Sequence, residues 1–269
     1  MGKFFLSVVI PCYNEEANLK RGVLKEVADY LKQQSYSWEV LVSDDGSTDR
    51  SLALISAFVK KNPGFRVLKN KHGGKPWAVS RGIKEARGQL TLLTDMDQST
   101  SIDQLEKLLP WVSRDYPVVI GSRGMERKGF PFFRKVGAMV FRQFRGFFIL
   151  KEISDTQCGF KLFRSDLLKE TFPQLDALGR IASGWTVTSF DVELLFMLQK
   201  RGARIKEVLV SWQDRDASVT KGKAGKSSNL RSYLARYFKE SRDMARQVLK
   251  VILNNWRGKY DRQPSDIKI

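Results

Sequence analysis

Three apolar runs of this 269-residue sequence each end in a cluster of polar residues that includes carboxylates. The clusters are Pro11-Cys12-Tyr13-Asn14-Glu15, Asp44-Asp45-Gly46-Ser47-Thr48-Asp49 and Asp95-Met96-Asp97. Two carboxylates that flank one residue, as Asp95 and Asp97 do, suit a hard divalent ion that bridges a diphosphate. Converging carboxylates repel one another unless a cation or hydrogen-bond donors lie among them. The sequence therefore predicts Mg²⁺ or Mn²⁺ bound at Asp95 and Asp97.

Each cluster taken alone has a plainer interpretation. A second Asp-x-Asp, Asp214-Arg215-Asp216, shows that this spacing by itself is weak evidence. The run from Asp44 to Asp49 is also typical of a turn followed by a helix cap. The order and spacing of all three clusters together favour a shared site.

The elements that would position these clusters alternate between strand and helix patterns over residues 1–122. Such alternation predicts an α/β fold, with a mainly parallel sheet and helices on both faces. Ligands of such sheets bind beyond the carboxyl ends of the strands, where all three clusters fall. Strands are expected over Phe5–Ile10, Trp38–Ser43, Phe65–Leu68, Leu90–Thr94 and Val118–Ile120, and helices over Glu15–Gln34, Thr48–Lys61, Trp77–Ala86 and Leu105–Val112.

The second half of the chain is less regular. We expect helices over Asp166–Glu170 and Ser189–Lys200, a strand over Ile205–Val210 and a loop over Lys221–Ser228. The chain is therefore divided into one domain of residues 1–220, with halves 1–122 and 123–220, and an appendage of residues 221–269. That appendage combines the basic loop with a long amphipathic helix.

The charge of the chain is strongly positive. Lys and Arg number 47 against 29 Asp and Glu, which gives a net charge of +18. Such a balance predicts an anionic partner, which could be nucleic acid, an acidic membrane face or a phosphorylated substrate. Residues 123–151 concentrate this charge, since Glu126 is their one acid. The two cysteines form no disulfide framework, so a reducing cytosol is expected.

Two segments pair an apolar stripe with a basic face. The first covers residues 230–256 and includes Val248, Ile252 and Trp256, and the second covers residues 132–148. Interfacial membrane helices have this profile. Apolar stripes also pack on a protein core or on another subunit, so a homo-oligomer stays open. No stretch is apolar enough to span a bilayer, and the N-terminus shows no signal-peptide pattern. We expect a peripheral protein on the cytoplasmic, inner face of the membrane, bound to anionic lipid.

The three clusters, together with Gly121-Ser122-Arg123, resemble family-two inverting glycosyltransferases, which have the A-type, Rossmann-like nucleotide-binding fold. Within that family, the segment Asp155-Thr156-Gln157-Cys158-Gly159-Phe160-Lys161-Leu162-Phe163 resembles the branch of the dolichyl-phosphate β-glucosyltransferases and other polyprenyl-phosphate glycosyltransferases. Trp212 followed by Ser218 is similar to a later segment of that branch. The resemblance extends over about residues 5–220. It implies a donor-binding half at residues 1–122 and an acceptor-binding half at residues 123–220.

By position, the resemblance implies roles for individual residues. Pro11, Tyr13 and Glu15 would border the base and ribose, and Asp44 or Asp45 would bind the edge of the base. Asp95 and Asp97 would contact the ribose, diphosphate and metal, with Asp97 also catalytic. Lys75 would lie beside the donor, although Pro76-Trp77 stands where the family has small residues. His72, the one histidine of the sequence, is expected to be a loop residue.

The chemistry of the acceptor accounts for the scarcity of histidine. A sugar hydroxyl needs a general base, whereas a phosphate monoester is largely anionic at pH 7 and needs positioning by cations. Arg123, Arg134 and Arg142 are the candidates for the acceptor phosphate, with Arg123 and Arg134 also counted as catalytic. A solvated basic face is the alternative. Asp191 could serve as a base if the acceptor is a hydroxyl, or could simply order the arginine cluster.

The leading prediction is transfer of a sugar, with glucose the first choice, from a UDP-sugar to a polyprenyl or dolichyl phosphate. Inversion would give a β-linked lipid phosphate sugar. One alternative keeps the fold but uses a saccharide or protein hydroxyl as acceptor. The other is a basic nucleic-acid-binding protein, which the acidic clusters disfavour because they would repel nucleic acid. We therefore expect no nucleic-acid partner.

Overall fold

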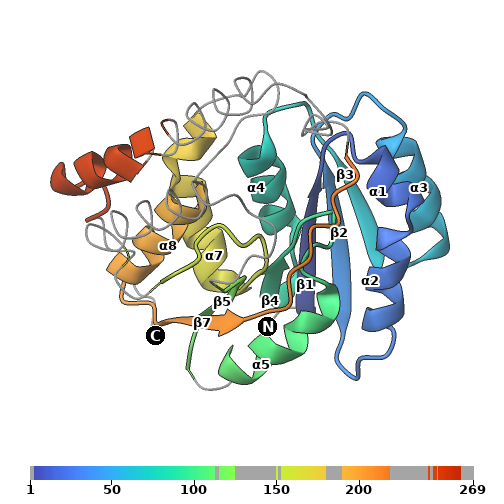
Figure 1. Ribbon diagram of the computed structural model, residues 1–269, viewed down its shortest axis with the longest axis horizontal. Coiled ribbons are helices and arrows are strands. Elements are labelled where there is room, and N and C mark those ends of the chain that lie inside the picture. The colour runs from blue at the N-terminus through green and yellow to red at the C-terminus, as the bar shows by residue number, and fades with distance from the viewer. Residues whose placement is uncertain are drawn as a thin grey trace.

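A seven-stranded, mainly parallel sheet with helices on both faces forms the centre of the protein (Figure 1). The computed structural model describes residues 3–112, 115–124, 150, 153–179, 190–218, 242, 245–246 and 248–261. The strand order is β3-β2-β1-β4-β6-β5-β7. The strands are β1 (Phe4–Cys12), β2 (Trp38–Asp44), β3 (Phe65–Lys69), β4 (Gly88–Leu93), β5 (Val118–Ser122), β6 (Lys161–Arg164) and β7 (Ile205–Leu209). The predicted α/β architecture is confirmed.

The helices of the first half alternate with these strands as the sequence predicts. They are α1 (Glu16–Lys20), α2 (Val23–Leu31), α3 (Ser51–Lys61), α4 (Lys75–Glu85) and α5 (Leu105–Val112). The prediction of one continuous helix over Glu15–Gln34 is wrong, because the chain breaks between α1 and α2. Gly22 has φ +92° there, a left-handed conformation that glycine adopts without steric cost.

The second half adds α7 (Ser165–Thr171), α8 (Phe190–Lys200) and the antiparallel strand β6. β6 pairs with β4 on one side and β5 on the other, so the two halves of the chain share one sheet. We did not expect this strand. Its four residues begin with a lysine and end with an arginine, which leaves too short an apolar pattern to recognise.

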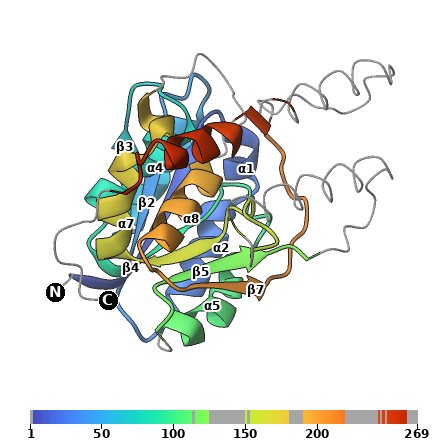
Figure 2. The ribbon, with the colours of Figure 1, turned by 90° about the vertical axis from the view of Figure 1, so that its left-hand side faces the viewer.

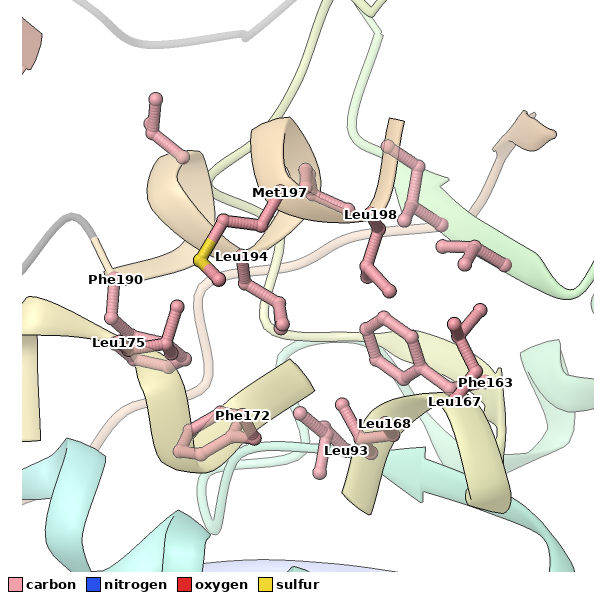
Figure 3. Packing of buried hydrophobic residues seen from close by; sticks show 14 of the residues in the cluster. Leu93, Phe163, Leu167, Leu168, Phe172, Leu175, Phe190, Leu194, Met197 and Leu198 are labelled. Atoms are coloured by element: carbon pink, nitrogen blue, oxygen red, sulfur yellow. The ribbon is translucent and has the colours of Figure 1, made fainter. Parts of the chain in front are cut away.

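Alternate residues of each strand face two separate hydrophobic clusters. Val8 and Ile10 of β1 face the cluster that includes α2 and α5, while Val9 faces the cluster that includes α4, α7 and α8. Figure 3 shows the packing of the second cluster, where side chains of β4, β6, α7 and α8 meet. Its labelled members are Leu93, Phe163, Leu167, Leu168, Phe172, Leu175, Phe190, Leu194, Met197 and Leu198. Because both faces of the sheet are buried, the strands are fixed in register.

Residues 248–256 are helical and lie beside α8 in both ribbon views (Figures 1 and 2). Val248 and Ile252 of the predicted apolar stripe are buried in the same cluster as α8, whereas Trp256 of that stripe is 75% exposed. This part of the stripe therefore packs largely on the core, one of the two outcomes left open. No helix in the described part of the chain is both long and apolar enough to cross a bilayer. The segment 132–148, Arg134, Arg142, and residues 219–241 with the predicted loop lie outside the described residues.

Candidate functional site

The carboxyl ends of β1, β2 and β4 lie next to one another at one edge of the sheet. Cys12 is the pairing partner of Asp44 in the register of β1 and β2, and the Thr94 amide donates to the Val9 carbonyl 3.2 Å away. The strand order reverses at β1, since β2 and β3 lie on one side of it and β4 lies on the other. Ligand sites of open α/β sheets form at such a reversal. The predicted convergence of the three clusters is confirmed.

The loops after β1 and β2 are joined by the side chain of Asn14. Its carbonyl oxygen accepts hydrogen bonds from the amides of Thr48 (2.8 Å) and Asp49 (3.3 Å). The backbone amide of Asn14 in turn donates to the Ser47 hydroxyl at 3.0 Å. Asn14 has φ +54°, a conformation that asparagine tolerates better than most residues. The loop that carries Tyr13 and Glu15 is thus fixed relative to the loop that carries Asp45.

Asp45 holds the loop before α4 through three hydrogen bonds. Its carboxylate accepts from the amides of Gly73 (2.9 Å) and Gly74 (2.8 Å) and lies 2.9 Å from Nδ1 of His72. The His72 ring stacks on Tyr13, with the ring centroids 4.3 Å apart and the planes at 20°. His72 is a loop residue, as expected, yet it joins two predicted donor-site residues. Nothing in its local sequence indicates that contact.

Asp44 is buried, and its two carboxylate oxygens differ. Oδ2 accepts the amides of Gly46 (3.1 Å) and Ser47 (3.2 Å), so the predicted turn is present. Oδ1 is buried and has no hydrogen-bond partner within the described ranges. A buried carboxylate oxygen without a donor is costly, so such an atom is a candidate for bonding a ligand.

Lys75 reaches Asp95 across the site, with 2.6 Å between Nζ and Oδ1. Pro76 does not prevent this contact, because it occupies the first turn of α4, where proline is well tolerated. The Asp95 side chain is 38% exposed and also lies against the backbone of Gly159. Asp45, Gly74, Lys75 and Asp95 therefore form a continuous path from the end of β2 to the end of β4.

Asp97 is more buried than Asp95, at 7% relative exposure. Its Oδ1 accepts the Ser99 amide at 2.9 Å, and its carbonyl accepts from the Arg21 guanidinium at 2.7 Å. The Glu15 carboxylate accepts a hydrogen bond from the side-chain amide of Asn18 at 2.6 Å. No group of three or more metal-ligating side chains occurs within the described ranges. The donor set at Asp95 and Asp97 fits a hard cation whose remaining ligands are phosphate oxygens and water.

Arg123 follows β5 and is engaged by Asp155. Its Nε lies 2.7 Å from Oδ2 of Asp155 and its second guanidinium nitrogen lies 2.8 Å from Oδ1, a bidentate pair. The guanidinium carbon also lies 5.9 Å from the centroid of the Trp212 ring. Burial would lower the pKa of Arg123, but the hydrogen bond and charge of Asp155 outweigh it and raise that pKa. Arg123 is thus a permanently charged side chain in a fixed orientation.

Asp191, in the first turn of α8, pairs with a buried lysine that sequence reasoning missed. Nζ of Lys161 lies 2.6 Å from Oδ1 of Asp191 and also donates to the Cys158 carbonyl. Lys161 is the first residue of β6 and its side chain is only 1% exposed. The sequence does not predict this burial, because lysine is almost never fully buried unless it is paired.

The sequence profile of Glycosyl transferase family 2 matches residues 7–172 of the chain. The dolichyl-phosphate β-glucosyltransferase of Dictyostelium discoideum is 33% identical over 233 residues, which cover 80% of this chain and 68% of that protein. The dolichyl-phosphate β-glucosyltransferases of Homo sapiens and Saccharomyces cerevisiae are 32% and 31% identical. The human alignment covers 79% of this chain and 68% of the relative, and the yeast alignment covers 80% and 69%.

Solved structures with the same fold are more distant in sequence. Mannosyl-3-phosphoglycerate synthase from Rubrobacter xylanophilus is 17% identical with a TM-score of 0.62, over 98% of this chain and 78% of that one. Glucosyl-3-phosphoglycerate synthase from Mycobacterium tuberculosis, crystallised with Mn²⁺, UDP and phosphoglyceric acid, is 18% identical with a TM-score of 0.61, over 99% and 82%. At these identities the comparison bears on the fold, which is the A-type glycosyltransferase fold.

Proposed function

The chain belongs to glycosyl transferase family 2, with the dolichyl-phosphate β-glucosyltransferases among its relatives, and we propose that it transfers glucose from UDP-glucose to a polyprenyl phosphate such as dolichyl phosphate. The reaction would invert the configuration at the anomeric carbon and give a β-linked lipid phosphate sugar. The observation that carries this proposal is the path from Asp45 through Gly74 and Lys75 to Asp95. This path joins a site suited to the nucleotide base with a site suited to the diphosphate.

In this proposal Asp44, rather than Asp45, accepts the hydrogen bond from the edge of the uracil. Uracil offers an N–H donor between two carbonyl groups, and Oδ1 of Asp44 is an acceptor that lacks a partner in the described part of the protein. The Asp45 carboxylate is already engaged with the loop of residues 72–74. The Tyr13–His72 stack would provide an aromatic surface beside the base. Pro11 and Glu15 would border the ribose.

Asp95 and Asp97 would hold Mg²⁺ or Mn²⁺ together with the diphosphate. Mg²⁺ is commonly bound by one or two carboxylates plus substrate phosphates, and a distant structural relative was crystallised with Mn²⁺ and UDP. When bound, the metal would stabilise the charge on the departing diphosphate. Lys75 lies beside Asp95 and would add a second positive charge there. Asp97, fixed by Ser99 and Arg21, would keep its position as the donor enters.

The acceptor phosphate would meet the basic residues of the second half, residues 123–220. Arg123 is oriented by Asp155, and the proposal adds Arg134 and Arg142, which lie outside the described residues. A phosphate acceptor is already anionic at neutral pH, so no side chain has to deprotonate it. Asp191, with a buried lysine 2.6 Å away, would then help to position the site rather than act as a base.

We place the protein peripherally on the cytoplasmic face of a membrane, where the lipid acceptor keeps its phosphate at the surface. Leu249, Leu253 and Trp256 are exposed on the helical segment of residues 248–256. At about 100° per residue these three share one face, and the exposed Arg246 and Arg257 lie along its edge. Apolar insertion beside cationic side chains suits anionic lipid, at about 1 kcal/mol for each basic residue near the surface. Buried Val248 and Ile252 are unsuited to that contact.

Acceptor-dependent release of UDP tests the function and separates it from the hydroxyl-acceptor alternative. The purified protein is given UDP-glucose and Mn²⁺ with dolichyl phosphate, with a free saccharide, or with neither. We expect the release of UDP to rise only when dolichyl phosphate is the acceptor. An increase with the saccharide but not with the lipid would favour the alternative acceptor.

A further inference from the structure

The segment Asp155–Lys161 contacts three candidate residues that come from separate parts of the chain. Asp155 forms the bidentate pair with Arg123, which follows β5. Lys161 pairs with Asp191 at the start of α8. Gly159 lies against Asp95, which follows β4. Residues 95, 123 and 191 are thus oriented by a single stretch of seven residues.

This segment is itself fastened to the sheet at both ends. Glu207 of β7 accepts hydrogen bonds from the Ser154 amide, the Ser154 hydroxyl and the Asp155 amide, at 2.8, 2.6 and 2.8 Å. At the other end the Gly121 amide of β5 donates to the Phe160 carbonyl at 2.8 Å. Phe160 is fully buried. The backbone between these attachments is therefore fixed, and a side chain added there cannot escape by moving the backbone away.

Gly159 is the point where this fixed backbone meets Asp95. A Cβ atom at residue 159 would lie 2.1 Å from Oδ2, 2.6 Å from Cγ and 3.0 Å from Oδ1 of Asp95. These are its three nearest neighbours, so the Asp95 carboxylate lies in the space that a side chain would need. Gly159 has no left-handed φ, and backbone freedom is not the reason for a glycine here. The reason is room for the Asp95 carboxylate.

We infer that Asp155–Lys161 is a positioning segment for the transfer site, and that Gly159 sets the place of the Asp95 carboxylate by leaving space for it. The inference rests on the proposed function for what Asp95 does, since Asp95 is there a donor and metal contact. Any side chain at residue 159 would displace the carboxylate from the position in which it contacts Lys75. The backbone that bears Asp95 would stay in place, because β4 is paired on both sides.

The test is a double-mutant cycle between Gly159→Ala and Asp95→Ala, with Gly179→Ala as the matched control. A Cβ at Gly179 has nothing within 4 Å, and its φ is not left-handed. Binding of UDP-glucose in the presence of Mn²⁺ is measured by calorimetry. Gly159→Ala should weaken binding roughly 10- to 100-fold, the usual effect of disturbing the support of a metal ligand. Gly179→Ala should bind as the wild type does. In the Asp95→Ala background Gly159→Ala should have no further effect.

Additive losses in that cycle would overturn the inference, because Gly159 would then act on something other than Asp95. The midpoint of thermal unfolding gives a second cycle that needs no ligand. Gly159→Ala should lower the midpoint by about 2–4 °C in the wild-type background. In the Asp95→Ala background Gly159→Ala should not lower the midpoint. The clash with the carboxylate is absent there, and an alanine in place of a glycine reduces the conformational entropy of the unfolded chain. Equal losses in both backgrounds would contradict the positioning role. Failure of the wild-type protein to bind UDP-glucose would instead count against the proposed function, and the thermal cycle would still decide the inference.

Discussion

Nζ of Lys75 and Oδ1 of Asp95 lie 2.6 Å apart, so the residue that opens α4 contacts a residue of the loop after β4. Both side chains are partly exposed, at 44% and 38%. A pair this exposed contributes little to stability. The pair matters for the chemistry of the site, because the ammonium group of Lys75 already contacts one oxygen of Asp95, the carboxylate that is proposed to bind a metal.

Lys75→Met should have opposite effects on the metal and on the nucleotide. Without Lys75, a divalent ion no longer competes with an ammonium group for Asp95, so Mn²⁺ alone should bind about 2- to 5-fold more tightly, in line with an exposed ion pair. UDP-glucose with Mn²⁺ should bind roughly 10- to 100-fold more weakly, because a charged donor to the diphosphate is lost. Calorimetry measures both affinities.

Lys71→Met is the matched control, since Lys71 is an exposed lysine of the loop that leads into α4. It removes the same charge without removing the contact to Asp95. If Lys75→Met and Lys71→Met bind the nucleotide sugar equally well, Lys75 has no specific role at the donor site.

Asp44→Asn should weaken UDP binding by roughly 10-fold or more, the value of a hydrogen bond to a charged group. Binding of pyrophosphate with Mn²⁺ should stay unchanged, because Oδ1 of Asp44 is proposed to contact the base alone. Asp45→Asn is the comparison. It disturbs the attachment of Gly73 and Gly74 and should weaken both ligands. Wild-type affinity of Asp44→Asn for UDP would contradict the assignment of the base contact to Asp44.

The sequence predicted the fold and the meeting of the three clusters because both follow from strand periodicity and parallel pairing. Val9 and Leu93 lie in register on adjacent strands, which brings Asp95 toward the end of β1. Contacts that depend on side-chain direction were not predictable in this way. Lys161 and His72 belong to this class, because each is defined by a partner 30 or 27 residues away in the sequence.

The amphipathic C-terminal segment shows a second limit of sequence reasoning. At helical spacing, Val248, Ile252 and Trp256 form one stripe, but the core accepts the first two and leaves Trp256 exposed. Leu249 and Leu253 are apolar as well and lie next to Trp256 around the helix, so the apolar residues form one broad arc, and periodicity alone could not decide which part of it is buried. The structure decides this because α8 provides a partner for Val248 and Ile252.

Replacing Leu253 and Trp256 together by serine should separate membrane binding from folding. Both side chains are exposed, so the unfolding midpoint should change little. Sedimentation with vesicles of phosphatidylcholine and phosphatidylserine should fall at least about 10-fold at high salt, where apolar insertion dominates over screened charge. Val251→Ser on the buried face is the control and should destabilise the fold by about 2–5 kcal/mol. Undiminished sedimentation of the double variant would remove this face from the membrane contact.

Glu193 should give a measurable pH dependence of stability. Burial raises the pKa of its carboxyl above the ordinary value of 4.5, although the hydrogen bond from the Tyr260 hydroxyl at 3.0 Å acts in the opposite direction. The folded state then holds the proton more tightly than the unfolded state. The associated stability is complete below the unfolded pKa and is lost as the pH rises through the folded pKa.

Relative to Glu193→Gln, the free energy of unfolding of the wild type should therefore fall as the pH rises above about 4.5, the unfolded value. Denaturant titrations of the two proteins at several pH values measure this difference. Glu106→Gln, at an exposed position, is the control and should follow the wild type. Parallel curves for the wild type and Glu193→Gln would mean that Glu193 titrates alike in the folded and unfolded chain.

The most direct measurement of the central claim is the identity of the product. The purified protein is incubated with labelled UDP-glucose, Mn²⁺ and dolichyl phosphate, and Asp97→Asn is treated identically. We expect the label to enter the lipid fraction as glucose joined to phosphate in the β configuration, as determined by NMR of the anomeric carbon. Asp97→Asn should be slower by about 10²-fold or more, the cost of losing charge stabilisation in a transition state. A wild-type protein that leaves the lipid unlabelled, or that forms an α-linked product, would contradict the proposed reaction.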